Sequence, residues 1–423
     1  MQLAGECKLA AMQDRDLYTT VLGLVVPWAI TNVELNARTE AIEVHIEANG
    51  VSRMPCPTCK ADCAIYDRRE RRWRHLDTCE YTTTIVAQVP RVRCDEHGVH
   101  QVVVPWGEPG SRHTAAFEAF AIGWLSEATV SAVARRLRLT WDQVDGIMQR
   151  AVARGLARRD ALKLKRIGVD ETSFQKRHEY VTVVTDQRTG HVVYVADDRK
   201  KGSLEGFFDQ FDAAELRALE SVSMDMWGPY ITVAHDRLER ARTKVCFDKF
   251  HVAKHLGDAL DKVRRLEQRE LLQRGDRALV GTKYTWLRNP ERMPAEREGF
   301  FERMKRVAIR TARAWALKEH AMCLWHFRSR SWARKAWEKW INWALRSRLE
   351  PVKRVARMVR EHLYGIINAI VLRATNASSE SANAKMQRVK RMACGFRNRE
   401  RFRNAIYFHL GGLDLLPGHH TRP

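Results

Sequence analysis

The sequence feature that most constrains the fold is two pairs of potential metal ligands with equal spacing near the N-terminus. Cys56 and Cys59 form the first pair, and Cys94 and His97 form the second. This spacing lets one tight turn direct both ligands of a pair at a single tetrahedral Zn²⁺. The segment 81–89 between the pairs is rich in Thr and Val and predicts a strand or a hairpin. We therefore predict one Cys3His zinc site.

This zinc site would be structural, because four protein ligands leave no position for a catalytic water. We expect it to hold together a small zinc-ribbon-like module at residues 50–108, after an N-terminal segment at residues 1–49. Cys63 or Cys79 could replace one ligand, and a set of unrelated free cysteines is the alternative reading. The chain has nine cysteines and no secretory start, which argues against a disulfide framework.

The charge of the chain favours a polyanionic partner. Lys and Arg number 73 against 51 acidic residues, which gives a formal net charge of +22. Nucleic acid is the first candidate, because cationic side chains release counterions from it on binding. A generally solvated basic surface is the alternative. The apolar run at 21–30 is shorter than the ~18 residues of a membrane span, so we expect a cytoplasmic protein.

A helix-turn-helix DNA-binding domain is predicted at residues 112–160. Apolar residues recur at helical spacing in the segments 117–125 and 130–137, and Thr140 and Gln143 form a capping box that opens a third helix. The expected outer surface of that helix presents Asp142, Gln143, Asp145 and Arg150. We take Gln143 and Arg150 as candidate DNA contacts in a major groove. A helical bundle of another purpose is the alternative.

Residues 163–250 change to short β-rich runs in the order β-β-β-α-β. The crossover through the helix should return the fourth strand parallel to the first, which would bring Asp225 beside Asp170. Neighbouring carboxylates repel one another, and divalent cations usually neutralise such a pair. We therefore predict a divalent-metal site at these two aspartates.

A third carboxylate, Glu380, lies in a segment with a helical pattern at residues 376–393. The expected apolar arc contains Ala382, Met386, Val389 and Ala393, and the opposite arc contains Glu380, Asn383, Gln387, Lys390 and Arg391. A metal-binding carboxylate one turn from cations suits the cleavage of a phosphate backbone. The candidate DNA-binding residues in this basic tail are Lys385, Arg388, Lys390, Arg391 and Arg397.

A largely helical, basic stretch at residues 251–372 separates the second and third carboxylates. We predict it to be an insertion domain, with the last part of the catalytic domain at residues 373–415. Its tryptophans include Trp315, Trp325, Trp332, Trp337, Trp340 and Trp343. Core packing is their usual role, and stacking on unpaired bases is the alternative.

Four ordered motifs resemble the ISL-three family of insertion-sequence transposases. They are GVDE at 168–171, MDMWGPY at 224–230, FDKFHV at 247–252 and ESANAK at 380–385. The runs RVKR at 388–391, GFRN at 395–398 and GGL at 411–413 also resemble that family's tail. The resemblance implies a multidomain α+β protein with a zinc-binding N-terminus, a helix-turn-helix and an RNase H-like α/β catalytic domain.

By motif, the family's acidic triad falls on Asp170, Asp225 and Glu380. The resemblance implies a DDE transposase that binds terminal inverted repeats and uses two Mg²⁺ (or Mn²⁺) ions to cleave and transfer DNA strands. Asp248 and His251 are second-tier candidates that could line the site without binding metal. The resemblance also implies a bacterial protein that associates with the nucleoid when bound to DNA. We expect a homodimer or higher oligomer on double-stranded DNA, both at the transposon ends and at the target. A non-catalytic DNA-binding regulator and a nuclease without strand transfer are the alternatives.

Overall fold

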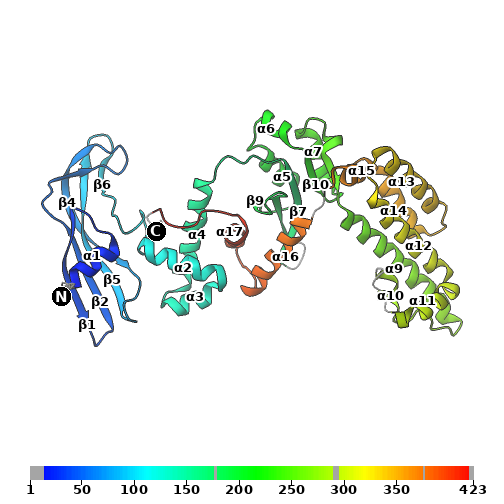
Figure 1. Ribbon diagram of the computed structural model, residues 1–423, viewed down its shortest axis with the longest axis horizontal. Coiled ribbons are helices and arrows are strands. Elements are labelled where there is room, and N and C mark those ends of the chain that lie inside the picture. The colour runs from blue at the N-terminus through cyan, green and yellow to red at the C-terminus, as the bar shows by residue number, and fades with distance from the viewer. Residues whose placement is uncertain (1–13, 176–178, 289–294, 375–376, 419–423) are drawn as a thin grey trace, which may run out of the picture. The chain divides into compact units, whose positions relative to one another are not determined.

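The computed structural model describes residues 14–175, 179–288, 295–374 and 377–418. The chain divides into two compact units (Figure 1). Residues 1–159 and 413–423 form the first unit, and residues 160–412 form the second unit. Each unit is described by itself below. None of the described helices is long and apolar enough to cross a membrane.

The first unit begins with a six-stranded sheet that holds both halves of the predicted metal site. Its strands follow the order β1-β2-β5-β4-β3, and β6 also pairs with β5. The elements are α1 (Asp14–Leu22), β1 (Trp28–Asn36), β2 (Ala41–Ala48), β3 (Arg53–Pro55), β4 (Asp62–Arg74), β5 (Thr82–Cys94) and β6 (Gly98–Gln101). Because β2 runs parallel to β5, the expected N-terminal segment is part of the same sheet as the metal ligands.

Three helices follow the sheet, as predicted: α2 (Ala115–Glu127), α3 (Val130–Leu137) and α4 (Trp141–Arg158). Each begins after a threonine whose hydroxyl accepts a hydrogen bond from the amide three residues on, and the capping box of Thr140 and Gln143 is present. The expected apolar stripe of α2 is only partly correct. Phe117 is buried, but Phe120 is 47% and Trp124 38% exposed, because α4 covers a narrower face of α2 than the pattern suggested.

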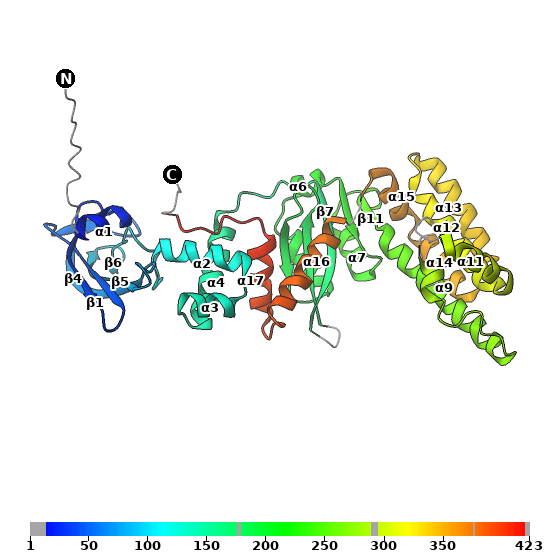
Figure 2. The same ribbon diagram turned by 60° about the horizontal axis from the view of Figure 1, so that its bottom comes forward.

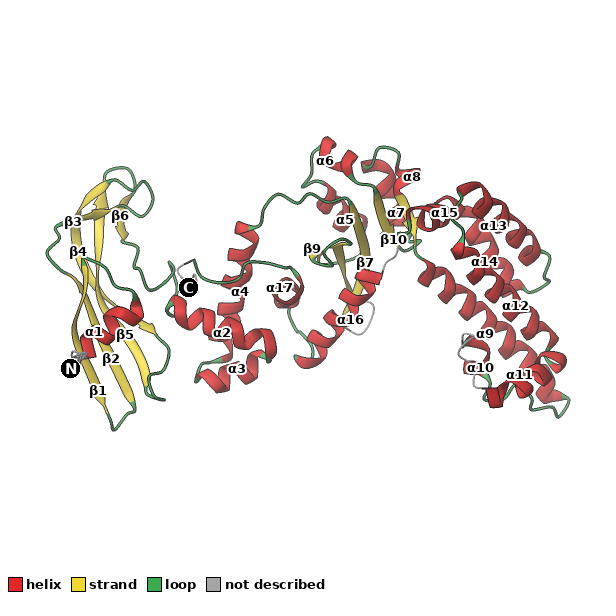
Figure 3. Ribbon diagram, viewed as in Figure 1, coloured by secondary structure: helices red, strands yellow, loops and turns green. Residues whose placement is uncertain are grey.

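The second unit contains a five-stranded sheet in the order β11-β10-β7-β8-β9 (Figure 3). Its elements are β7 (Arg166–Gln175), β8 (Glu179–Asp186), β9 (Val192–Ala196), α5 (Lys201–Phe208), α6 (Ala213–Ala218), β10 (Ser221–Met224), α7 (Gly228–Arg237), α8 (Ala241–Lys244) and β11 (Val245–Phe247). Strands β7, β8 and β9 pair antiparallel, whereas β10 is parallel to β7 and to β11. The predicted strand order and the parallel return are confirmed.

Helices fill the stretch between β11 and the Glu380 segment. They are α9 (Lys249–Gln273), α10 (Lys283–Leu287), α11 (Ala295–Val307), α12 (Ile309–Cys323), α13 (Arg330–Leu345), α14 (Glu350–Glu361) and α15 (Leu363–Leu372), with a 3₁₀ turn at Leu324–His326. Trp337 and Trp340 are fully buried, and Nε1 of Trp340 donates to the carbonyl of Leu317 at 2.8 Å. Core packing is therefore confirmed for these two, whereas Trp332 is 64% exposed.

The chain then returns to the sheet of the second unit. Helix α16 (Ala377–Met392) contacts β7 and β8, and α17 (Arg399–Leu410) contacts β9 (Figure 2). Ala382 and Met386 are buried, as their arc predicts. Ala393 is exposed, because the helix ends before it.

Candidate active site and metal centre

Asp170 and Asp225 lie at the same level on two neighbouring parallel strands. The register pairs Gly168 of β7 with Ser223 of β10. Asp170 and Asp225 are each two residues further along, towards the carboxyl ends of the strands. The predicted juxtaposition of the two carboxylates is therefore observed.

Backbone amides and side chains orient both carboxylates. Oδ1 of Asp170 accepts from its neighbouring amide, that of Glu171, at 2.7 Å, and Oδ2 accepts from Nδ2 of Asn383 at 2.5 Å. Oδ1 of Asp225 accepts from the amide of Met226 at 2.6 Å and lies 3.5 Å from Nδ1 of His251. Each aspartate thus accepts a hydrogen bond from the backbone amide that follows it, and each is approached by a side chain from a helix later in the chain.

Three polar side chains of helix α16 donate hydrogen bonds to residues of strand β7. Beyond Asn383, Nε2 of Gln387 donates to the hydroxyl of Thr172 at 2.9 Å, and Nζ of Lys390 donates to the carbonyl of Ser173 at 2.8 Å. Lys390, a predicted DNA contact, is thus bound to the backbone of β7, and burial lowers its pKa.

Glu380 lies in the first turn of α16, three residues before Asn383, and its side chain lies outside the described residues. The exposed cations of the basic tail are Lys385, Arg388, Arg391 and Arg397.

Glu171 faces a cationic and aromatic cluster beside the two aspartates. Its pKa is raised mainly by burial, and further by the charges of Asp225 and Asp170, while Arg199 opposes the rise from 3.5 Å. The guanidinium of Arg199 lies 5.0 Å from the ring centre of Trp227. Sequence reasoning missed Arg199, because no local pattern marks it. Trp227 and Asn383 were within reach of such reasoning, since Trp227 belongs to a motif and Asn383 lies on the predicted polar arc.

The second-tier residues Asp248 and His251 lie at the start of α9. Asp248 is buried and occupies the N-cap position of the helix without a capping hydrogen bond from its side chain, and His251 approaches Asp225 as given above. Helix α15 passes close to the end of β11. A Cβ placed at Gly365 would lie only 2.4 Å from Cδ2 of Phe247, so only glycine leaves room at this position. That close approach fixes the strand end from which Asp248 follows.

The four predicted zinc ligands come together in the first unit. The ligand atoms of Cys56, Cys59, Cys94 and His97 all lie within 4.8 Å of one another. Sγ of Cys94 is 3.6 Å from Sγ of Cys59 and 3.5 Å from Nδ1 of His97. The hydrogen bond to His97 is the main cause that lowers the pKa of Cys94 to about 6, and a thiolate is the form that binds Zn²⁺.

Neither alternative ligand belongs to this cluster among the described residues. Cys63 is buried on β4, and burial is the main cause that raises the pKa of its thiol. Cys79 is exposed in a turn with positive φ. The two pairs of equal spacing therefore form the site without either of them.

The outer surface predicted for α4 needs correction at two of its four residues, Asp145 and Arg150. Gln143 is exposed, but Asp145 is 6% exposed and accepts from Gln149 at 2.8 Å. Arg150 turns inward and donates through Nη2 to Oε1 of Glu118 at 2.6 Å. Its side chain is 34% exposed and its charge is paired with a buried carboxylate, so it does not point freely outward as we expected.

Comparisons with known proteins agree with this modular order. A transposase family model matches residues 167–406, a model of the helix-turn-helix domain of transposase family ISL3 matches 102–152, and a model of the zinc-finger of transposase IS204/IS1001/IS1096/IS1165 matches 52–97. The transposase for insertion sequence element IS1557 of Mycobacterium tuberculosis (strain ATCC 25618 / H37Rv) is 30% identical over 396 residues, which cover 87% of this chain and 88% of that protein. The transposase for insertion sequence element IS1001 of Bordetella parapertussis is 25% identical over 372 residues, covering 86% and 89%.

Proposed function

Because the chain belongs to transposase family ISL3 and is a DDE transposase, we propose that Asp170, Asp225 and Glu380 form its catalytic centre. The observation that carries this proposal is the register of β7 and β10, which sets Asp170 and Asp225 side by side. Two carboxylates at the ends of adjacent parallel strands form a site that divalent cations stabilise.

The proposed position of Glu380 in this centre follows from the contact of α16 with β7. Asn383 bonds to the Asp170 carboxylate, and residues three apart on a helix share a face. The backbone position of Glu380 is therefore on the same face of α16 as that of Asn383, one turn nearer to the N-terminus of the helix. Helical geometry thus favours Glu380 as the third acid, and the family motif favours the same residue.

We further propose the finer domain plan that follows from this assignment. Residues 50–108 form the zinc-binding module and residues 112–160 the DNA-binding domain. An RNase H-like catalytic domain at residues 163–250 and 373–415 is interrupted by a helical insertion at residues 251–372. The central antiparallel pair, the parallel return and the long helical stretch before α16 support this plan.

The donor set of the proposed centre fits Mg²⁺ or Mn²⁺, which prefer carboxylate oxygens. Two such ions would supply charge neutralisation and an activated oxygen nucleophile for displacement at phosphorus. Asn383 would hold Asp170 in its rotamer, and His251 would lie beside Asp225. The exposed cations of the basic tail, with Gln143 on α4, would contact DNA.

The proposed reaction has two displacements at phosphorus. In the first, water attacks a phosphodiester at an end of the element, and the broken P–O bond leaves a 3′ hydroxyl. In the second, that hydroxyl attacks a phosphodiester of target DNA, so that one P–O bond forms and another breaks. The site's task in both steps is to position the reactants and stabilise charge.

We assign Zn²⁺ a structural role at Cys56, Cys59, Cys94 and His97, supported by the clustered ligand atoms and by the matched zinc-finger segment. We also propose that the protein acts at terminal inverted repeats, pairs two ends as a dimer or higher oligomer, and associates with the nucleoid when bound to DNA.

The test compares three purified proteins on a plasmid that carries the gene with its native flanking DNA, in the presence of Mg²⁺. They are wild type, Asp225→Asn and the control Asp236→Asn, which removes an exposed charge paired with Lys201. New 3′ ends and joined products are mapped. We expect cuts at the flanks and joined products with wild type and the control only, whereas Asp225→Asn should still bind the ends.

Other outcomes identify what is wrong. Cleavage by Asp225→Asn would contradict the assignment of this carboxylate. Specific binding by wild type without any cut would favour the regulator, and cuts without joined products would favour a nuclease.

A further inference from the structure

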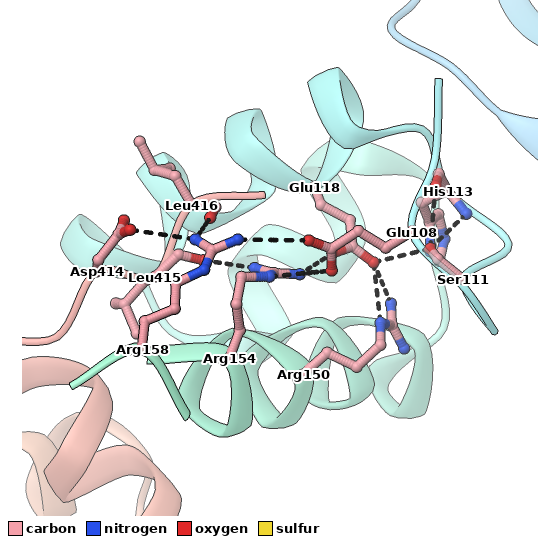
Figure 4. Close-up of polar contacts among 10 residues, drawn as sticks. All are labelled: Glu108, Ser111, His113, Glu118, Arg150, Arg154, Arg158, Asp414, Leu415 and Leu416. Carbon is pink, nitrogen blue, oxygen red and sulfur yellow. Dashed lines mark hydrogen bonds and ion pairs between the residues drawn. The ribbon is translucent and has the colours of Figure 1, made fainter. Parts of the chain in front are cut away.

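The end of the chain returns to the third helix of the helix-turn-helix (Figure 4). We call residues 413–418 the clasp. Arg154 of α4 donates through Nη1 to the carbonyl of Leu415 at 2.5 Å. One turn later, Nη1 of Arg158 donates to the carbonyl of Leu416 at 2.6 Å and to Oδ2 of Asp414 at 3.1 Å. Charged donors make these hydrogen bonds stronger than neutral ones.

A glycine in α4 makes room for the clasp. A Cβ placed at Gly155 would lie 2.7 Å from Cβ of Leu413 and 3.1 Å from the carbonyl oxygen of Asp414. Glycine inside a helix is less stable than alanine, so the local helix alone would favour a side chain here. The close approach of Leu413 gives a packing reason for the glycine.

The arginines that bind the clasp also belong to a buried ionic network. Arg154, whose side chain is 7% exposed, pairs with Glu108 and with Oε2 of Glu118. Arg150, Arg154 and Arg158 follow at intervals of four on one face of α4. Figure 4 shows the three arginines projecting from α4, with Arg158 and Arg154 reaching the clasp and Arg154 and Arg150 reaching Glu118. The clasp therefore completes the coordination of side chains that already fix α4 to α2.

We propose that the clasp is an integral part of the DNA-binding unit, and that it immobilises α4 for recognition of the element ends. This inference rests on the proposed function, in which α4 reads DNA. The clasp lies beyond residue 406, where the matched transposase segment ends, and beyond the matched helix-turn-helix segment. Because the chain passes between the two units at 159/160 and again at 412/413, the clasp also makes a second covalent link between the units.

The first test uses two truncated proteins that are matched except for the clasp. One ends at Gly418 and keeps the clasp, and the other ends at Gly412 and lacks it. Hydrogen exchange measured by mass spectrometry should be at least about tenfold faster in the second half of α4 for the shorter protein, since three charge-assisted hydrogen bonds are lost. Exchange in β7 and β10 should be equal in both. Equal exchange in α4 would overturn the proposal.

The second test compares the direction in which two Gly→Ala substitutions change the unfolding temperature. Gly123→Ala in α2 is the control, because a Cβ there meets no atom within 4 Å, and it should raise the unfolding temperature of the first unit. Gly155→Ala should lower that temperature and should speed exchange in α4. A rise like that of the control would show that the clasp does not pack on α4 in solution.

The functional part is measured as the affinity for DNA that carries an element end. We expect the protein ending at Gly412 to bind about tenfold more weakly or worse than the one ending at Gly418. Equal affinities would overturn the role in recognition even if exchange differs. If wild type itself does not bind the ends, the proposed function fails, while the exchange comparison still decides whether the clasp holds α4.

Discussion

The buried carboxylate of Glu118 provides the sharpest stability test of the first unit. Its side chain is 1% exposed. Oε1 accepts from Ser111 at 2.8 Å and from Nε and Nη2 of Arg150 at 2.9 and 2.6 Å, and Oε2 accepts from Arg154 at 2.9 Å. Glu118→Gln keeps the shape of the side chain but removes its charge and turns an amide N–H group towards a guanidinium. Both arginines then lose their shared counter-ion.

The expected cost follows from the loss of one partner in a buried ion pair. Such losses cost about 3 kcal/mol where one partner is partly exposed, as Arg150 is. For a unit of this size the unfolding temperature should fall by about 6–12 °C. Calorimetry measures this fall, and the transition that a zinc chelator shifts identifies the first unit.

The control is Glu127→Gln, which changes an exposed glutamate at the end of the same helix. It should shift the transition by less than about 2 °C, as for most surface charges. A shift that small for Glu118→Gln would refute the reasoning, because it would show that the network contributes no more than an exposed pair.

Three further predictions concern the metal centre, the active site and the response to pH. Cys94→Ser should lose the zinc that wild type binds at about one ion per chain, as measured by atomic absorption, while Cys323→Ser should keep it, because Cys323 is exposed and lies far along the chain from the ligands. Asn383→Ala should slow strand cleavage by about 10- to 100-fold through loss of the Asp170 contact, with unchanged affinity for end DNA; an unchanged rate would exclude a positioning role. Burial lowers the pKa of His113 to about 4, so the folded chain keeps this imidazole neutral, and its contribution to stability is complete above pH about 6.5 and is lost as the pH falls towards 4. Unfolding temperatures measured from about pH 7 to about pH 4.5 should therefore fall less steeply in His113→Asn than in wild type. Identical slopes would show that His113 does not contribute to the pH dependence of stability.

Features that depend on short stretches of chain were predictable from the sequence. The Thr140 capping box, the β-β-β-α-β order and the Asp170–Asp225 juxtaposition follow from local periodicity, turn residues and the handedness of crossovers. The zinc ligands were predictable because Cys56 and Cys94 each open a pair of fixed spacing. In each case, a local sequence pattern or a general rule for connections between strands indicates the geometry.

Contacts between distant segments were not predictable in this way. Arg150 was expected on the outer surface because helical periodicity gives a face but not its partner, and Glu118 is 32 residues away in sequence. The contact from Arg154 to Leu415 spans 261 residues. The pairing of β2 with β5 is also long-range and parallel, so no turn signal marks it. Asn383 is intermediate, since its face was predicted but its contact with Asp170 was not.

The inward contact of Arg150 shows that the two halves of α4 have different tasks. Recognition helices place residues near their N-terminus on base edges, and Trp141, Asp142 and Gln143 are exposed there. The second half carries the arginines that are bound to Glu118 and to the clasp. Substitutions in the first half should therefore change which end sequence is bound, whereas loss of the clasp should weaken binding to all sequences alike, because it loosens the helix without changing the side chains that face DNA.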